Sequence, residues 1–168
     1  MSGSDDFPLR PYLAADIMPL RELFAASIEE LTADDYNEDQ RIAWASAAED
    51  AEAFAKRLSS SLTLVVHIED EHLGFATLKD NAVLDMLYVH PWHARIGVAT
   101  ALVDAMEKIA TARGVEAMTV EASDTAVPFF EERGYAATSR NLVEMDDEWL
   151  SNTSMTKQLK ASAAKAVS

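Results

Sequence analysis

Helical periodicity dominates the first part of the chain. The apolar residues of segment 17–31 recur every three or four positions, the spacing that places them on one face of a helix. Asp16 stands directly before this segment and is a residue type that caps helix N-termini. An apolar run at 9–13 precedes it, and the polar residues 32–36 follow it. We therefore expect a first strand and then a first helix that Asp16 caps.

Two capping motifs follow this first helix. Asn37 with Gln40, and Ser46 with Glu49, each have the spacing of a capping box, in which two side chains three residues apart bond each other's backbone N–H groups. These motifs predict a helical pair over residues 38–58.

The apolar period then shortens to two, which is the period of a strand with one buried face. Segments 62–68 and 74–78 predict a hairpin around the polar turn 69–72. A further strand over 83–89 ends at Pro91, because proline has no N–H to continue a ladder.

The last part of the chain returns to mixed periodicity. Apolar residues between 98 and 109 form one helical stripe, and Gly114 is typical of a helix C-terminus that needs a left-handed residue. We write the whole order as βααβββαβαββ, an α/β fold. The remaining predicted elements are a strand over 115–121, a short helix over 124–133 closed by Gly134, and two strands over 135–145 and 149–157.

Length and composition bound the kind of protein. The 168 residues suffice for one domain with a full core, expected over 1–159, followed by a flexible low-complexity tail at 160–168. The chain has no cysteine, no secretory signal and no apolar stretch long enough to cross a bilayer, so we expect a cytoplasmic location. The net charge of -15 disfavours nucleic acid as a partner; it suits a cationic acceptor or simply solubility.

The segment 87–100 carries the chemistry. It joins a strand to a helix start, where N–H groups have no intrahelical partner and the helix dipole is positive, an arrangement that binds anions. Gly97 and Ala99 project no bulky side chain, so a phosphate could come close to this backbone. Taken alone, the pattern more often marks only a tight turn that needs small residues.

Three segments in the same order resemble the GNAT superfamily of acyl-CoA-dependent N-acetyltransferases over residues 9–159. YVHPWHARIGVATALV is similar to the acyl-CoA signature Q/R-x-x-G-x-G/A, and VEASDTAVPFFEERGY to the later segment that closes the CoA cleft. DDYNEDQRIAWAS looks like the N-terminal segment of one bacterial branch. The resemblance implies a mixed, mostly antiparallel sheet flanked by helices, acetyl-CoA as cosubstrate, no metal, and direct attack by a small-molecule or peptide amine in a ternary complex.

The same resemblance implies which residues hold the cofactor. Backbone groups of 95–100 would cradle the phosphates, and backbone groups of 87–89 would contact the pantetheine and the developing oxyanion. Ser123 takes the place of an asparagine that meets the pantetheine arm in the family. The full set of expected cofactor-binding residues is Leu87, Tyr88, Val89, Arg95, Ile96, Gly97, Val98, Ala99, Thr100, Ser123, Ala126, Phe129 and Phe130.

Two positions depart from the family pattern. The first Gln or Arg of the signature falls on Ala94, and we expect Arg95 to contact the pyrophosphate in its place. Phe130 occupies the position of a tyrosine that protonates the leaving thiolate in many relatives. Either Tyr135 or Tyr88 replaces it, or the thiolate leaves unaided, since thiols have a pKa of about 8.5.

A proton acceptor is expected on the strand before the signature. Asp85 lies two residues before Leu87, and strand parity would place both on the face where the thioester should sit. Its apolar neighbours would desolvate the carboxylate, which suits a base that works near neutrality. The alternative is a structural bond to a backbone group or an arginine. Glu121, at the end of the neighbouring strand, is the second candidate.

The remaining candidates concern the acceptor and a metal. Tyr36 and Trp44 flank the helices where the family has its acceptor cleft, so each is either a wall of that cleft or a core aromatic. His90 and His93 have no third ligand nearby in the sequence, and we expect surface histidines and no metal.

Two other classes of function stay open, together with the assembly state. Phe130 and Ala94 would also suit an acyl-CoA-binding module without catalysis, and a small interaction domain without any ligand is the second alternative. A homodimer is an assembly that the sequence leaves open.

Overall fold

Within residues 7–159, seven strands form one sheet in the order β1-β2-β3-β4-β5-β7-β6. A computed structural model describes residues 7–159, so the predicted tail at 160–168 lies outside the described residues. Only β4 and β5 pair in parallel, which confirms the mixed, mostly antiparallel sheet. The strands are β1 (Leu9–Pro11), β2 (Leu62–Ile68), β3 (Glu71–Lys79), β4 (Val83–Val89), β5 (Ala117–Ser123), β6 (Ala136–Met145) and β7 (Glu148–Gln158).

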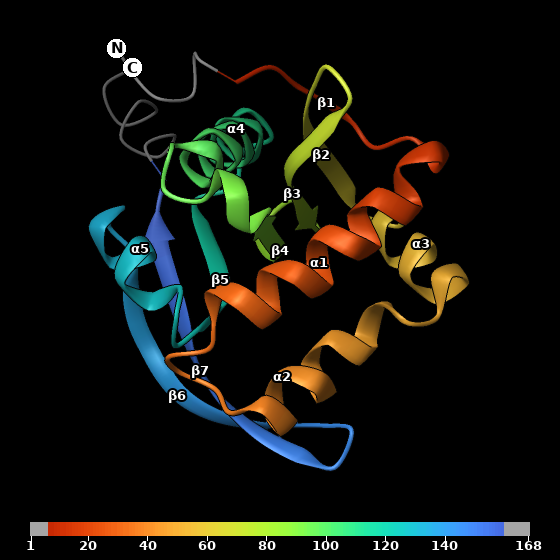
Figure 1. Cartoon of the computed structure of the whole chain (residues 1–168). Helices are drawn as coiled ribbons and strands as arrows, with labels where there is room; N and C mark the ends of the chain where they lie inside the picture. Colours follow the sequence, from red (N-terminus) through yellow and green to blue (C-terminus); the bar gives the residue numbers. More distant parts are fainter. Residues whose placement is uncertain (1–6, 160–168) are drawn as a thin grey trace, which may run out of the picture.

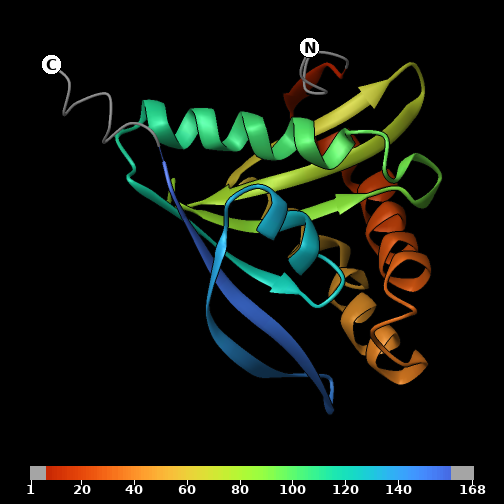
Figure 2. The ribbon, with the colours of Figure 1, turned by 90° about the vertical axis from the view of Figure 1, so that its left-hand side faces the viewer.

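Helices cover both faces of this sheet. Figures 1 and 2 show α1, α2 and α3 on one face and α4 and α5 on the other. No helix of the described part of the chain is long and apolar enough to span a membrane. The helices are α1 (Ile17–Leu31), α2 (Glu38–Ala45), α3 (Ala51–Ser59), α4 (Val98–Ala112) and α5 (Val127–Glu132), with 3-10 turns at Ala14–Asp16, Ser46–Ala48 and Pro91–His93.

The predicted order of elements has one helix fewer than the structure. The helical pair expected over 38–58 is present as α2 and α3, so that with α1 three helices separate β1 from β2. The order βααβββαβαββ has only two helices at this place. The strand predicted over 83–89 and the helix expected after Gly97 have the bounds that the sequence indicated.

One of the two predicted capping boxes is present. The backbone N–H of Gln40 donates to Asn37 Oδ1 across 2.8 Å, and the N–H of Asn37 donates to Gln40 Oε1 across 2.9 Å. The second box was wrong, because Ser46 lies in a 3-10 turn. Asp50 begins α3 instead, by accepting a hydrogen bond from the N–H of Ala53 at 3.1 Å.

The predicted cap of α1 was wrong as well. The buried carboxylate of Asp16 makes no capping hydrogen bond to α1. It accepts from the backbone N–H of Leu13 at 2.8 Å, from Arg10 through two oxygens at 2.7 and 2.8 Å, and lies 2.9 Å from His72 Nε2. Tertiary partners from β1 and β3 therefore take the carboxylate that the local pattern assigned to the helix.

The parallel strands β4 and β5 stay paired over a short distance only. Val83 pairs with Thr119 and Leu84 with Val120, and no further pair of these two strands occurs among the described residues. From there the strands separate towards their C-terminal ends, and this opening positions the site described below.

A β-bulge lies where the strands begin to separate. Thr77 pairs with Met86 while the next residue of β3, Leu78, pairs with Leu84, so Asp85 is an extra residue in β4. A bulge interrupts the alternation of side chains. Leu84 accordingly packs into the core under α4 and Met86 into the core under α1, although the two residues are two apart.

Candidate functional site

A cavity of about 740 Å³ opens where β4 and β5 separate. Its walls come from both strands, from α1, α2 and α3 on one side, from α5 and β7, and from the loop that leads into α4. Of the residues predicted from the sequence, those that line it are Tyr36, Trp44, Asp85, Leu87, Tyr88, Val89, Arg95, Gly97, Ala99, Thr100, Glu121, Ser123, Ala126, Phe129 and Phe130.

The loop before α4 presents open backbone N–H groups to this cavity. Arg95 and Gly97 both have a left-handed backbone, with φ of 66° and 102°, which winds the loop around the helix start. No side chain caps α4 at Gly97, so its first N–H groups remain available to an anion. Ile96 points its exposed side chain elsewhere and Val98 is buried in the core, so these two do not line the cavity.

Tyr135 lies away from the cavity. Its ring is buried against α4, and its hydroxyl donates to Glu107 Oε2 across 2.8 Å. Burial and the negative charge of Glu107 raise the pKa of this tyrosine. The structure thus contradicts the role of Tyr135 as a substitute for the tyrosine missing at Phe130, because its hydroxyl faces another helix.

Tyr88 is the tyrosine that the structure brings to the cavity beside β4. The indole Nε1–H of Trp44 donates to its hydroxyl oxygen across 3.1 Å, and its ring centroid lies 4.6 Å from that of Phe24. Burial raises the pKa of Tyr88 to about 12, so the hydroxyl keeps its proton at neutral pH. Since indole can only donate, that proton is left to be donated to another group.

Asp85 lies on the other side of the sheet from the one that strand parity predicted. Leu87 packs into the core under α4, whereas the carboxylate of Asp85 accepts from Arg57 Nε of α3 at 3.2 Å. The bulge at Asp85 causes this difference. The carboxylate is also not isolated as expected, because the guanidinium of Arg57 is its hydrogen-bond partner. It still lines the cavity, and its side chain is 26% exposed.

Arg57 is a charged residue of the cavity that the sequence analysis did not indicate. It lies 28 positions before Asp85 on α3, and no local pattern connects an exposed arginine of a helix to a strand on the far side of a hairpin.

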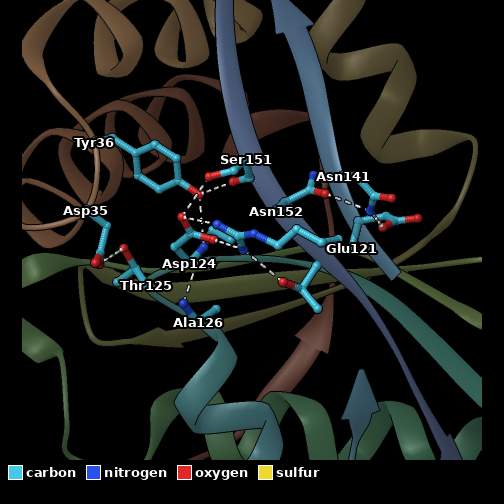
Figure 3. A network of polar contacts seen from close by, with 12 residues as sticks. Asp35, Tyr36, Glu121, Asp124, Thr125, Ala126, Asn141, Ser151 and Asn152 are labelled. Atoms are coloured by element: carbon cyan, nitrogen blue, oxygen red, sulfur yellow. Dashed lines mark hydrogen bonds and ion pairs between the residues drawn. The ribbon is translucent and has the colours of Figure 1, made fainter. Parts of the chain in front are cut away.

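Glu121 of β5 is held by neighbours on the C-terminal strands. Its Oε2 accepts from Ser154 Oγ at 2.5 Å and from Asn141 Nδ2 at 3.2 Å. Figure 3 shows this group next to the network around Asp124. Glu121 lines the cavity, with two of its hydrogen bonds already satisfied by the protein.

Tyr36 closes the cavity at the junction of α1 and α2. Its hydroxyl donates to the carbonyl of Ser151 at 2.6 Å and accepts from the N–H of Asp124 at 2.9 Å (Figure 3). Burial raises its pKa. The hydroxyl is therefore occupied, and the ring, 5.4 Å from that of Trp44 between centroids, is what Tyr36 offers as a wall.

The network behind Tyr36 is anchored by an ion pair. Arg140 of β6 donates to both oxygens of Asp124, at 2.6 and 3.1 Å, and hydrogen bonds from this arginine hold the pKa of Asp124 below its usual value. Ser123 Oγ accepts from the N–H of Ala126 at 3.2 Å, which shapes the turn into α5. These contacts fix the turn after β5 against β6 and β7.

The rings of His90 and His93, in the loop before α4, lie 5.7 Å apart between centroids, but no third ligand side chain of the described residues groups with them. His90 Nδ1 accepts from the backbone N–H of Trp92, and His93 lies against Glu71. A different group does converge: Asp16, His67 and His72 place ligand atoms within 4.8 Å of one another.

A guanidinium already lies inside that second group. Arg10 Nη2 is 2.7 Å from Asp16 Oδ1 and 2.8 Å from His67 Nδ1, so it takes the position that a shared cation would need. The rings of His67 and His72 stack beside it, with centroids 4.1 Å apart. The cluster ties β1, β2 and β3 together outside the cavity.

The sequence model of a family described as "Acetyltransferase (GNAT) domain" matches residues 32–159, and the chain belongs to this family. It is 30% identical over 148 residues to the uncharacterized N-acetyltransferase YafP of Escherichia coli K12, an alignment that covers 88% of this chain and 93% of YafP.

Solved structures show the same relationship. A GCN5-related N-acetyltransferase from Rhodopseudomonas palustris, also described as an aminotransferase of class II, is 53% identical with a TM-score of 0.89, over 91% of this chain and 96% of that one. The PaiA N-acetyltransferase of Thermoplasma acidophilum, solved in complex with coenzyme A, shares the fold at 18% identity and a TM-score of 0.75, over 90% and 98% of the two chains.

Proposed function

We propose that the protein transfers an acetyl group from acetyl-CoA to a primary amine by direct attack in a ternary complex. The observation that carries this proposal is the cavity of about 740 Å³ between the separated ends of β4 and β5, which reaches the uncapped start of α4. One end can bind phosphate through backbone N–H groups. The other end is walled by α1, α2 and α3 and contains ionisable side chains that could take a proton from the amine.

The cofactor would bind along β4. Backbone N–H groups of 95–100 would hold the pyrophosphate, with Arg95 beside them, because this arginine lines the cavity next to the helix start. Residues 87–89 pair with β3 on one edge, but beyond Leu84 no pairing with β5 covers the other edge, so the backbone groups on that edge could bond the pantetheine amides.

The chemistry needs a proton acceptor and hydrogen-bond donors. The amine nitrogen would bond to the thioester carbonyl carbon, the C–S bond would break, and the CoA thiolate would leave. The Asp85 carboxylate, which lies beside Arg57, would take the proton of the amine, with Glu121 as the second candidate. Tyr88 retains its hydroxyl proton and would donate a hydrogen bond to the reacting group.

Binding and turnover test this function separately. Calorimetry should detect acetyl-CoA binding, and release of free CoA thiol should follow when a panel of amines is supplied. Gly97→Val should abolish binding, because the side chain obstructs the phosphate approach. Gly114→Val is the matched control: its backbone is also left-handed, with φ of 84°, but it lies at the other end of α4, away from the cavity.

The outcomes separate the alternatives. Binding without CoA release for any amine would identify a non-catalytic acyl-CoA-binding module. Absence of binding would leave an interaction domain without this ligand. Equal binding by the Gly97 and Gly114 variants would show that the phosphate site lies elsewhere.

A further inference from the structure

Arg57 brings a cation to the inner end of the cavity. Its Nε–H donates to Asp85 at 3.2 Å, and its side chain is 44% exposed. A guanidinium has five N–H donors. Among the hydrogen bonds of the described residues, Arg57 uses only the one on Nε, so both terminal nitrogens remain for a ligand.

The charged side chains that line the cavity divide by position. They are Arg57, Asp85, Arg95 and Glu121. Arg95 stands beside the helix start, and Glu121 is held by Ser154 and Asn141. Asp85 lies four residues before the end of β4, roughly 13 Å of extended strand from it. Arg57 and Asp85 are therefore an adjacent cation and anion at the end away from the phosphate site.

Part of the cavity wall is apolar. Phe24 and Ile28 of α1, Trp44 of α2 and Met86 of β4 line the cavity and belong to, or pack against, the core cluster under α1. The hydroxyl of Tyr36, which would add polarity, is bonded to Ser151 and Asp124. An acceptor seated here would therefore pair its charges with Arg57 and Asp85 and place an apolar group against the aromatic rings.

We propose that the acceptor is a zwitterionic amine of the amino-acid type with an apolar or aromatic side chain. This inference rests on the proposed function. The terminal nitrogens of Arg57 would bind the acceptor's carboxylate, in the geometry that a guanidinium offers to a carboxylate, and Asp85 would receive the ammonium group and then its proton. The amino and carboxylate groups of an amino acid lie about as close to each other as the side chains of Arg57 and Asp85, so both groups could be bound at once.

The charges that each acceptor carries distinguish amino acids from other amines. A diamine or polyamine would bring a second cation towards Arg57, and a simple alkylamine would leave the guanidinium without an anionic partner. The overall charge of -15 attracts amines in proportion to their positive charge and gives no advantage to a zwitterion, whose net charge is zero. The local pair therefore decides the selectivity.

The experiment compares free amino acids with their carboxamides. The common L-amino acids, their amides and aliphatic diamines are assayed for CoA release. We expect kcat/KM for apolar and aromatic amino acids to exceed that of their amides by about 10- to 100-fold, the range for a charge-assisted hydrogen bond. Arg57→Gln should reduce this ratio to near one, mainly through a higher KM for the free amino acid.

The ratio of kcat/KM for an amino acid to kcat/KM for its amide isolates the contact between Arg57 and the carboxylate of the acceptor. Any effect of Arg57→Gln through Asp85 changes both members of a pair equally, so it cancels in the ratio. Lys56→Gln is the control, because this neighbouring lysine of α3 is exposed and does not line the cavity. Amides or diamines that react as well as amino acids, or a ratio unchanged in Arg57→Gln, would overturn the inference and leave the proposed function standing. CoA release with none of the amines would overturn both.

Discussion

The indole Nε1–H of Trp44 on α2 donates to the hydroxyl oxygen of Tyr88 on β4 across 3.1 Å. This bond joins α2, which walls the end of the cavity proposed for the acceptor, to β4, along which the cofactor would bind. It also fixes the direction of the tyrosine proton, because the oxygen is the acceptor and its own O–H must point elsewhere. Because Tyr135 bonds Glu107 outside the cavity, we propose Tyr88 as the tyrosine that would donate during the reaction.

Replacing Tyr88 by phenylalanine tests this donor. Tyr88→Phe keeps the ring against Phe24 but removes the hydroxyl, so acetyl-CoA binding should persist while kcat falls by about 10²-fold, the scale for loss of one preorganised donor. Stopped assays of CoA release and calorimetry measure the two effects. Tyr12→Phe is the control, because Tyr12 packs on the same core and does not line the cavity. Unchanged kcat in Tyr88→Phe would remove the hydroxyl from the mechanism.

The carboxylate of Asp85 is the expected proton acceptor. Asp85→Asn conserves size and can still accept from Arg57, so the variant should fold and bind acetyl-CoA like the parent. Its kcat should fall by about 10²-fold or more, the usual effect of a general base. Glu121→Gln, assayed in parallel across the pH range, decides between the two candidates: a larger loss there than in Asp85→Asn would assign the proton to Glu121.

Arg95 is expected to compensate for Ala94 at the pyrophosphate. Arg95→Ala should weaken CoA binding by about 1 to 3 kcal/mol, roughly a 5- to 150-fold rise in Kd, because a charge-assisted hydrogen bond is lost. Calorimetry at low salt gives the most direct comparison. Lys108→Ala removes an exposed charge from α4 outside the cavity and should leave Kd unchanged. If both variants bind alike, the backbone alone holds the phosphates.

Gly74 lets α4 lie close to β3. A Cβ at this position would be 2.8 Å from Val98 Cγ1 and 3.0 Å from the carbonyl oxygen of Tyr88. Gly74→Ala should therefore lower the free energy of unfolding by about 1 to 3 kcal/mol through overpacking, as measured by denaturant titration. Adding Val98→Ala relieves the closer contact and should recover part of the loss. A Gly74→Ala protein as stable as the parent would show that the helix shifts at no cost.

The cluster around Asp16 predicts how stability depends on pH. Partial burial and the nearby charges of His72 and Arg10 lower the pKa of His67, although Asp16 and Asp70 act in the opposite direction. The unfolded chain therefore binds this proton more readily than the folded protein, and stability should fall as the pH drops below the ordinary histidine value of 6.5.

A second loss of stability, due to Asp16, should follow at lower pH. Burial alone would raise the pKa of Asp16, but hydrogen bonds from Arg10, His72 and Leu13 outweigh it and hold that pKa well below its usual 3.8. The stabilisation is present above 3.8 and is lost as the pH falls further.

Melting temperatures measured between pH 3 and 8 test both steps. His67→Asn keeps an oxygen that can accept from Arg10 but does not titrate. Its melting temperature should change less with pH than the parent's around pH 5 to 7, roughly the range in which an ordinary histidine titrates. Identical curves for the two proteins in this range would contradict the assignment to His67.

Much of the fold could be predicted from local pattern. The apolar segment 83–89 before Pro91 gave β4 with the observed bounds, Asn37 and Gln40 gave the start of α2, and Gly97 marked the start of α4 at the cavity. These signals depend only on residues a few positions apart, because periodicity and caps are properties of one segment.

The chemistry within the site depended on partners that are remote in sequence. The side of the sheet on which Asp85 lies follows from a bulge, and a bulge is a property of the pairing between β3 and β4. The partner of Asp85 is Arg57 of α3, and the hydroxyl of Tyr135 points to Glu107 of α4. The sequence by itself determined most of the segments that form helices and strands, and where α4 begins at the cavity. Tertiary structure alone decided where each side chain points and which group it meets, because those depend on register and packing between elements that no local spacing encodes.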